Sequence, residues 1–224
     1  MELKIKRQIA ISDARKALIL DAARRVLTRA GLEKASMREI AKEAGYTPGA
    51  IYGYFASKQL ILSDLLDSVL ESLTAAVAQR VTPKVAPEQA LCARGQAWIS
   101  YLMEHPFDKQ LLLHLYRADR SDKQGQGSSL RIHERVLGTL EPLSQSVPLD
   151  SLDPEMAASE LEAIWAHALG LLLSSEADAA ANSVVAVSER FTNYLTRLSN
   201  SLVGANLVQP AAQENSATQL DMFA

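Results

Sequence analysis

Cysteine is almost absent from this 224-residue chain, and its single thiol, Cys92, excludes an intramolecular disulfide and any cysteine-cluster metal site. Aromatic residues make up only 5% of the sequence. No unbroken apolar run reaches the roughly 18 residues that a membrane span needs. The first residues alternate basic and apolar types and lack the apolar core and cleavage site of a signal peptide. These features predict a soluble, cytoplasmic protein with no membrane partner.

Motifs for catalysis are missing as well. The four histidines have neither the i, i+4 metal spacing nor an HExxH pattern. Gly125 and Gly127 lie in a polar loop and follow no strand pattern, so they do not form a dinucleotide fingerprint. We therefore expect no enzyme activity, no metal site and no cofactor.

Charge is distributed unevenly along the chain. Residues 1–60 hold twelve Lys and Arg against six Asp and Glu, whereas residues 61–224 hold eleven against twenty. The alternative is a chance fluctuation in solvated charge, but a basic first quarter joined to an acidic remainder favours one part that binds a polyanion. The basic part ends where the fourth predicted helix begins.

Helical periodicity dominates and no alternating run argues for a strand, so the fold class expected is all-α. The small, polar residues 204–224 predict a disordered tail. The predicted helices span residues 14–30, 37–44, 48–55, 57–80, 88–104, 107–119, 130–144, 154–175 and 183–203.

Residues 36–55 have the layout of a helix-turn-helix. Ser36 with Glu39 three positions later is a capping box at the start of one short helix, and Gly45 ends it. Thr47 caps the next helix, and Pro48 takes the first position, where its missing N–H costs nothing. The second helix of such a pair enters the major groove of DNA.

The residues of this second helix suit a DNA surface. Its first turn, residues 47–50, consists of small side chains that let the backbone approach the DNA closely. Tyr52 and Tyr54 offer hydroxyls to phosphate oxygens. Lys58 stands at the start of the following helix, where its charge opposes the helix dipole, which hints at a phosphate contact.

The segment ILDAARRVLTRAGLEKASMREIAKEAGYTPGAIYGYFASKQLIL resembles the DNA-binding domain of the TetR family of bacterial transcriptional regulators. The resemblance rests on Ile19-Leu20-x-Ala22-Ala23, Gly31, Ser36, Ile40-Ala41, Ala44-Gly45 and Gly49-x-x-Tyr52-x-Tyr54-Phe55-x-x-Lys58. So many fixed spacings over about 45 residues are specific. Leu27 stands where the family often has phenylalanine, and Tyr46 replaces a small aliphatic residue.

The resemblance implies an all-helical homodimer with an N-terminal three-helix DNA-binding domain and a C-terminal ligand-binding and dimerisation domain. The expected divisions are a basic arm at 1–12, the DNA-binding domain at 13–73, the C-terminal domain at 74–203 and the tail at 204–224. By position, the DNA backbone would contact Ser36, Arg38, Thr47, Tyr52, Tyr54 and Lys58. Base edges would face Pro48, Gly49, Ala50 and Gly53. The alternatives are structural: Ser36 and Thr47 only cap, and Tyr52 only fills the core.

The C-terminal half carries weaker signals. Residues 154–175 and 183–203 are rich in small residues, which favours a four-helix dimer interface over ordinary intrachain packing. A small-molecule pocket needs an apolar wall with a few polar groups, and Trp98, Tyr101 and His114 are the candidates. Each of them is also a plausible core or surface residue.

The last residues contain a second, shorter resemblance. The peptide Gln219-Leu220-Asp221-Met222-Phe223 is similar to the motif by which bacterial proteins dock on the replicative sliding clamp. The aliphatic and aromatic members would be groove anchors, and the glutamine would hydrogen-bond. The alternative is a coincidence of five residues.

Two functions of different classes follow from the sequence. The first is a sequence-specific transcriptional regulator, most simply a repressor that a small-molecule ligand releases from a palindromic operator in double-stranded DNA on the nucleoid. The second is a DNA-bound adaptor for replication or chromosome maintenance that recruits the clamp through its tail. A helical enzyme or carrier has no support in the residues.

Overall fold

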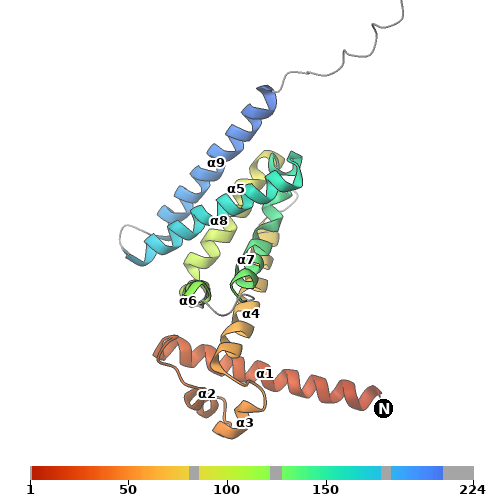
Figure 1. Ribbon diagram of the computed structural model, residues 1–224, viewed down its shortest axis with the longest axis vertical. Coiled ribbons are helices and arrows are strands. Elements are labelled where there is room, and N and C mark those ends of the chain that lie inside the picture. Colours follow the sequence, from red (N-terminus) through yellow and green to blue (C-terminus); the bar gives the residue numbers. More distant parts are fainter. Residues whose placement is uncertain (1, 81–85, 122–127, 178–182, 209–224) are drawn as a thin grey trace, which may run out of the picture.

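Helices account for every regular element in the residues that the structure, a computed structural model, describes, namely 2–80, 86–121, 128–177 and 183–208. The all-α prediction is confirmed. The amphipathic patterns of this chain have the helical period of 3.6 residues, and so they bury one stripe per helix. The elements are arranged as a small N-terminal domain below a larger helical bundle (Figure 1).

The N-terminal domain consists of α1 (Glu2–Ala30), α2 (Met37–Glu43), α3 (Pro48–Tyr52) and the first turns of α4 (Lys58–Arg80). Its core contains Ile19 of α1, Ile40 of α2 and Ile51 of α3, each fully buried. Phe55 and Leu62 close the core from the α4 side. Each short helix therefore contributes one or two apolar anchors and leaves its other faces to solvent.

The C-terminal bundle consists of α5 (Pro87–Glu104), α6 (Pro106–Ser121), α7 (Ser128–Ser144), α8 (Pro154–Ala177) and α9 (Val184–Val208), with a 3₁₀ turn at Leu149–Ser151. Trp98 of α5 is fully buried at its centre and packs edge-on against Trp165 of α8 at 6.0 Å between ring centroids. Helix α5 lies against both α4 and α9 (Figure 1). The two domains share α4, so its axis is common to both.

The structure corrects the prediction for the N-terminus. Helix α1 begins at Glu2, not near residue 14, so residues 2–12 are the first three turns of the helix. The reason is local: no glycine or proline occurs before Gly31, and Leu, Lys, Arg, Gln and Ala all favour the helix. Gly31, at φ 85°, then ends it as expected.

The prediction for the C-terminus also changes. Helix α9 continues through Gly204 to Val208, five residues past the predicted start of the tail. One glycine costs a helix only about 1 kcal/mol relative to alanine, so helix-favouring neighbours carry the helix across it. The clamp-like peptide Gln219–Phe223 lies outside the described residues and stays a prediction.

Helix α8 is the apolar element of the bundle. Over Pro154–Glu176 it is, among the described residues, long and apolar enough to cross a membrane by length and composition, and 33% of that stretch is buried. Core helices of soluble proteins pass the same test, so this is weak evidence for a membrane. Its large apolar residues Ile164, Trp165 and Leu172 are buried in the bundle, whereas Met156, Ala163, Gly170 and Leu173 are exposed.

Gly95 of α5 permits the close approach of α9. A Cβ atom built on Gly95 would lie 2.1 Å from Cδ1 of Leu195 and 3.3 Å from Cε1 of Phe191. Both of these side chains are fully buried, so neither has free space to move into. The contact between α5 and α9 therefore depends on a residue without a side chain.

We expect Gly95→Ala to lower the free energy of unfolding by about 1–3 kcal/mol because it overpacks this contact. Gly138→Ala, inside α7 with nothing within 4 Å of its Cβ position, is the matched control. It should be neutral or stabilising by up to about 1 kcal/mol through helix propensity. Urea unfolding followed by circular dichroism measures both, and equal effects would contradict the packing argument.

Candidate nucleic-acid interface

The turn between α2 and α3 is built from backbone hydrogen bonds. Gly45, at φ 75°, adopts the left-handed conformation that favours glycine. The Tyr46 N–H donates to the Ala41 carbonyl at 2.8 Å, and the Gly45 N–H donates to the Lys42 carbonyl at 3.2 Å. This pair of bonds is a Schellman motif, which ends α2 sharply. The turn thus fixes the angle at which α3 leaves α2.

Helix α3 begins with the predicted cap. The Thr47 hydroxyl accepts a hydrogen bond from the Ala50 N–H at 3.2 Å, and Pro48 occupies the first turn. Ile51 is fully buried and anchors the helix in the domain core. Only one residue of α3 is thus committed to the core.

The remaining residues of α3 face solvent. Residues 48, 49, 50, 52 and 53 are all exposed, and the Tyr52 side chain is 54% exposed, which rules out the alternative that it fills the core. Nothing lies within 4 Å of the Cβ position of Gly49, and its φ is not positive, so packing within this chain gives no reason for a glycine there. The predicted base-facing residues therefore form one open surface.

Tyr54 is fixed beside this surface. Its hydroxyl accepts a hydrogen bond from Arg15 of α1 at 3.1 Å, and its ring meets Tyr46 edge-on at 5.7 Å between centroids. This hydrogen bond raises the pKa of the Arg15 guanidinium. Tyr46, which departs from the resembled family, therefore braces Tyr54 from the turn. The bond also brings a positive charge of α1 next to α3.

Lys58 has a different position from the one that its sequence context suggests. Its ammonium group donates to three backbone carbonyls, those of Leu32, Glu33 and Ala35, each at 3.1 Å. An ammonium group has three protons, so these bonds use all its donors. We therefore reassign Lys58 from phosphate contact to a structural role: it holds the loop between α1 and α2 against α4. The positive charge of Lys58 at the N-terminus of α4 is compensated by these three carbonyl oxygens. The sequence pattern alone does not reveal such partners, because they lie in the loop between α1 and α2.

Ser36 and Arg38 begin α2 at the edge of the surface. The Ser36 hydroxyl donates to the Glu39 carboxylate at 2.8 Å and accepts from the Glu39 N–H at 3.3 Å, which confirms the capping box. Hydrogen bonds from the Ser36 side chain and backbone lower the pKa of Glu39. Arg38 is exposed beside them. The role of Ser36 as a cap is thus shown, and a further contact to DNA stays a prediction.

The junction of the two domains contains a buried carboxylate that the sequence analysis missed. Asp108 of α6 is 2% exposed and accepts hydrogen bonds from Arg24 of α1 at 2.6 Å and from the Tyr101 hydroxyl of α5 at 2.9 Å. The Arg24 guanidinium also stacks over the Phe107 ring, 4.8 Å from its centroid. Burial, and then the hydrogen bond to Asp108, raise the pKa of Tyr101. These groups join α1 to α5 and α6.

The predicted ligand residues Trp98, Tyr101 and His114 each have a partner within the chain, and their role in a ligand pocket stays a prediction. The Trp98 indole N–H donates to the Thr139 hydroxyl at 2.8 Å inside the core, and Tyr101 belongs to the Asp108 cluster. The Nδ1 atom of His114 lies 3.2 Å from Oε1 of Glu33 in the N-terminal domain.

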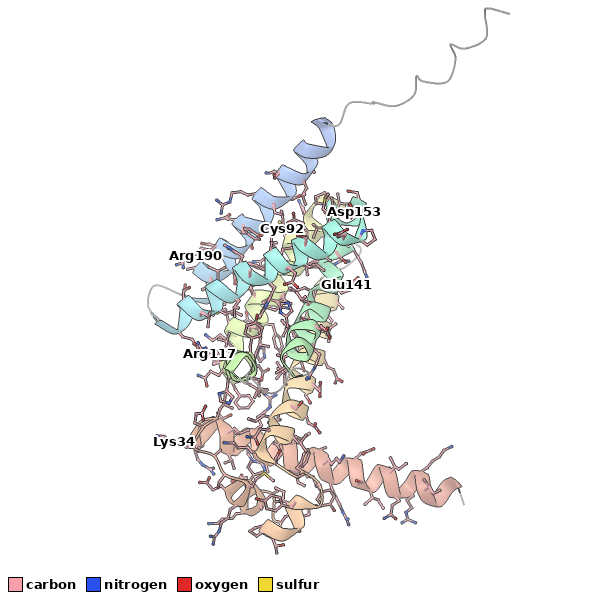
Figure 2. All side chains as sticks on the ribbon, viewed as in Figure 1. Lys34, Cys92, Arg117, Glu141, Asp153 and Arg190 are labelled. Carbon is pink, nitrogen blue, oxygen red and sulfur yellow. The ribbon has the colours of Figure 1, made fainter. Side chains whose placement is uncertain are left out.

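The grooves in the described part of the chain include one beside α4 and one at the domain junction. One, of about 570 Å³, lies between α4 and α7; its lining is Asp67, Leu70, Glu71, Thr74, Ala75, Ala78, Arg135, Gly138 and Thr139. The other, of about 790 Å³, lies at the domain junction and is lined by residues 30–34 with Gln110, His114, Arg117 and Glu176. Figure 2 shows Lys34 and Arg117 on the same side of this junction.

Comparison with known proteins agrees with the geometry. Residues 19–65 match the model of the bacterial regulatory proteins of the tetR family. The chain is 29% identical over 92 residues to the HTH-type transcriptional regulator YfiR of Bacillus subtilis, covering 41% of this chain and 42% of that protein. It is 31% identical over 75 residues to the HTH-type regulator BetI of Vibrio campbellii, covering 34% and 38%. The chain thus spans about two fifths of the length of these relatives.

Solved structures extend the likeness to the whole fold. A transcriptional regulator from Rhodococcus aligns with a TM-score of 0.63 at 21% identity, covering 83% of this chain and 96% of that one. FadR of Bacillus subtilis, solved with stearoyl-CoA, aligns with a TM-score of 0.60 at 19% identity, covering 80% and 97%. At these identities the match shows the fold alone. The tetR-family model matches residues 19–65, so the likeness to that family in sequence is established for this helix-turn-helix segment.

Lys58→Met tests the reassigned role of Lys58. The substitution keeps the apolar stem and leaves three carbonyls without their donor, so we expect the free energy of unfolding to fall by about 1–3 kcal/mol. Lys42→Met on the exposed surface of α2 is the control, for which little change is expected. Thermal unfolding measures both. A Lys58→Met protein of unchanged stability would contradict the structural role.

Proposed function

We propose that this protein belongs to the TetR family and is a homodimeric transcriptional regulator, most simply a repressor, that binds a palindromic operator through α3 and is released by a small-molecule effector. The observation that carries the proposal is the exposed surface of α3. Ile51 alone anchors this helix, and Tyr52 and Gly49 have no use in packing within the chain. A rigid turn that presents a small-residue helix suits insertion into a major groove. Operator binding places the protein in the cytoplasm, on the nucleoid.

Helix α8 supports the homodimer. Its exposed residues Met156, Ala163 and Gly170 recur every seven positions, and so do Ser159, Ala166 and Leu173. A seven-residue repeat on one helical face is the pattern of a seam between helices, and small side chains let two helices approach closely. We propose that a second copy of this chain packs against this face of α8, and that α9 of each copy completes the interface. A dimer of this kind would present two α3 helices to the two halves of a palindrome.

The groove between α4 and α7 is the proposed effector site. Its volume of about 570 Å³ is within the range of small-molecule sites. Leu70, Ala75 and Ala78 supply an apolar wall, and Glu71 adds a carboxylate at its lining. This lining suits an effector with an apolar body and a positively charged or hydrogen-bond-donating group. Other structures of this fold contain ligands as different as stearoyl-CoA in FadR and resorcinol in RolR, so the fold does not select the effector.

The proposed release mechanism uses two links between the domains. Helix α4 begins in the DNA-binding domain at Lys58 and lines the groove nine residues and more further on, from Asp67 to Ala78. An effector that separates α4 from α7 would tilt this shared helix. The Arg24–Asp108 pair joins α1 to α6 and would act as the pivot. The tilt would change the spacing of the two α3 helices, and binding of the operator would weaken.

The proposed function is tested by selection of random duplexes on the full-length protein in moderate salt. We expect one palindrome to be enriched, with half-sites about one helical turn or a multiple apart. Tyr52→Ala should abolish the enrichment while the unfolding transition stays unchanged, because Tyr52 is exposed. Bulk binding without an enriched sequence, or enrichment that survives in the variant, would contradict the proposal.

Asp108→Asn tests the pivot without knowledge of the effector. The amide keeps the shape but not the charge that binds Arg24, so the joint should loosen and the spacing of the two α3 helices should vary. We expect affinity for the palindrome to fall about tenfold, or roughly 1.4 kcal/mol, with affinity for a single half-site unchanged. Lys109→Gln is the control, since Lys109 donates to Ser175 inside the bundle. An equal loss on both duplexes, measured by fluorescence anisotropy, would contradict a role in coupling.

A further inference from the structure

The N-terminal half of α1 is a helix that packs on little else. Residues 5–15 are exposed throughout except for Ser12, and the side chains of this half project into open space (Figure 2). Ile5 and Ile9 are each 55% exposed. The helix continues straight out of the DNA-binding domain, past α3 (Figure 1). A structured extension of this kind presents a rigid surface, whereas a flexible arm would follow whatever groove it met.

This extension is basic. Residues 2–16 contain five Lys and Arg against Glu2 and Asp13, a net charge of +3. At 100° per residue, Arg7 and Arg15 lie within about 80° of each other on one face of α1, roughly 12 Å apart along its axis. By helical register, Lys4 follows Arg7 one turn further out. One face of the helix therefore carries a row of cationic positions.

The row begins at the proposed DNA surface. Arg15 is its inner member, and its guanidinium donates to the Tyr54 hydroxyl directly after α3. The N-terminus of α1 and helix α9 lie on opposite sides of the molecule, so in a dimer formed through α8 and α9 the extension would point away from the partner (Figure 1). A cationic row that continues outward from a DNA-contacting helix faces the duplex next to the half-site.

We propose that residues 2–15 of α1 bind the phosphate backbone of the DNA that flanks each operator half-site, through the face that carries Lys4, Arg7 and Arg15. The proposal rests on the proposed function as a DNA-binding regulator. The distance from Arg15 to Lys4 is roughly 16 Å of helix, which corresponds to about five base pairs of additional duplex on each side. The contact adds affinity without adding sequence specificity, because phosphates are the same in every sequence.

The exposed apolar residues of this face are compatible with another polyanion. Ile11 is 43% exposed and Leu18 is 62% exposed, and both lie between or beside the cationic positions. A mixed basic and apolar helix also suits an anionic lipid surface. The hydrogen bond from Arg15 to Tyr54 favours DNA, because a membrane on this face would meet the α3 surface as well.

The test uses the full-length protein and two duplexes, the selected operator cut at its outer edges and the same operator with about six added base pairs of unrelated sequence on each side. We expect the wild-type protein to bind the flanked duplex about tenfold more tightly at 0.1 M salt. Lys4→Gln with Arg7→Gln should remove this gain and leave affinity for the trimmed operator unchanged. In the flanked duplex the log–log salt slope should fall by about 3 to 4, since a dimer loses four phosphate contacts.

Lys6→Gln with Lys16→Gln is the matched control, because it removes the same charge from the other faces of the same helix. This control variant should still bind the flanked duplex about tenfold more tightly than the trimmed operator. Equal losses in the two double variants, or a flank effect that persists in Lys4→Gln with Arg7→Gln, would overturn the proposal. Unchanged DNA binding together with lost binding to phosphatidylserine vesicles would assign the helix to a membrane and overturn it too. A wild-type protein that binds neither duplex would contradict the proposed function itself.

Discussion

Asp108 is the charge on which the arrangement of the two domains depends. A buried carboxylate is costly unless hydrogen bonds and a cation compensate it, and here Arg24 of α1 and the Tyr101 hydroxyl of α5 do so. Because Asp108 and its two partners come from three helices, the cost of burying Asp108 is met only when α1, α5 and α6 are correctly placed. Asp108 therefore stabilises this arrangement of the domains and disfavours arrangements in which its partners are displaced.

The other link between the domains is covalent. Helix α4 contributes Leu62 to the core of the DNA-binding domain and Leu70 and Leu73 to the bundle. A rigid helix that belongs to both domains cannot move in one of them without moving in the other. The Asp108 cluster, in contrast, joins the domains at one point, about which they can rotate. In the proposed release mechanism, this helix and this contact would make the spacing of the two α3 helices depend on the groove beside α4.

The DNA-binding surface depends on what the fold leaves unused. The Lys58 ammonium group donates its hydrogen bonds to three backbone carbonyls, and the Ser36 hydroxyl donates to the Glu39 carboxylate. Residues 48–50 and Tyr52, by contrast, have no packing role within the chain. Sequence motifs mark all of these positions alike. Only the contacts separate those that hold the domain together from those that remain available to a partner.

The sequence by itself determined the helices, the capping box at Ser36, the cap at Thr47 and the turn at Gly45, because these depend on residues within four positions of each other. Helix ends without a strong local signal, at Glu2 and Val208, were missed, since propensity changes gradually there. The tertiary structure alone decided the roles of Lys58, Trp98 and Asp108. Apart from Tyr101, seven residues before Asp108, their partners lie 23 to 84 residues away in the chain. No periodicity of the sequence encodes contacts at such separations, because they arise only when helices pack.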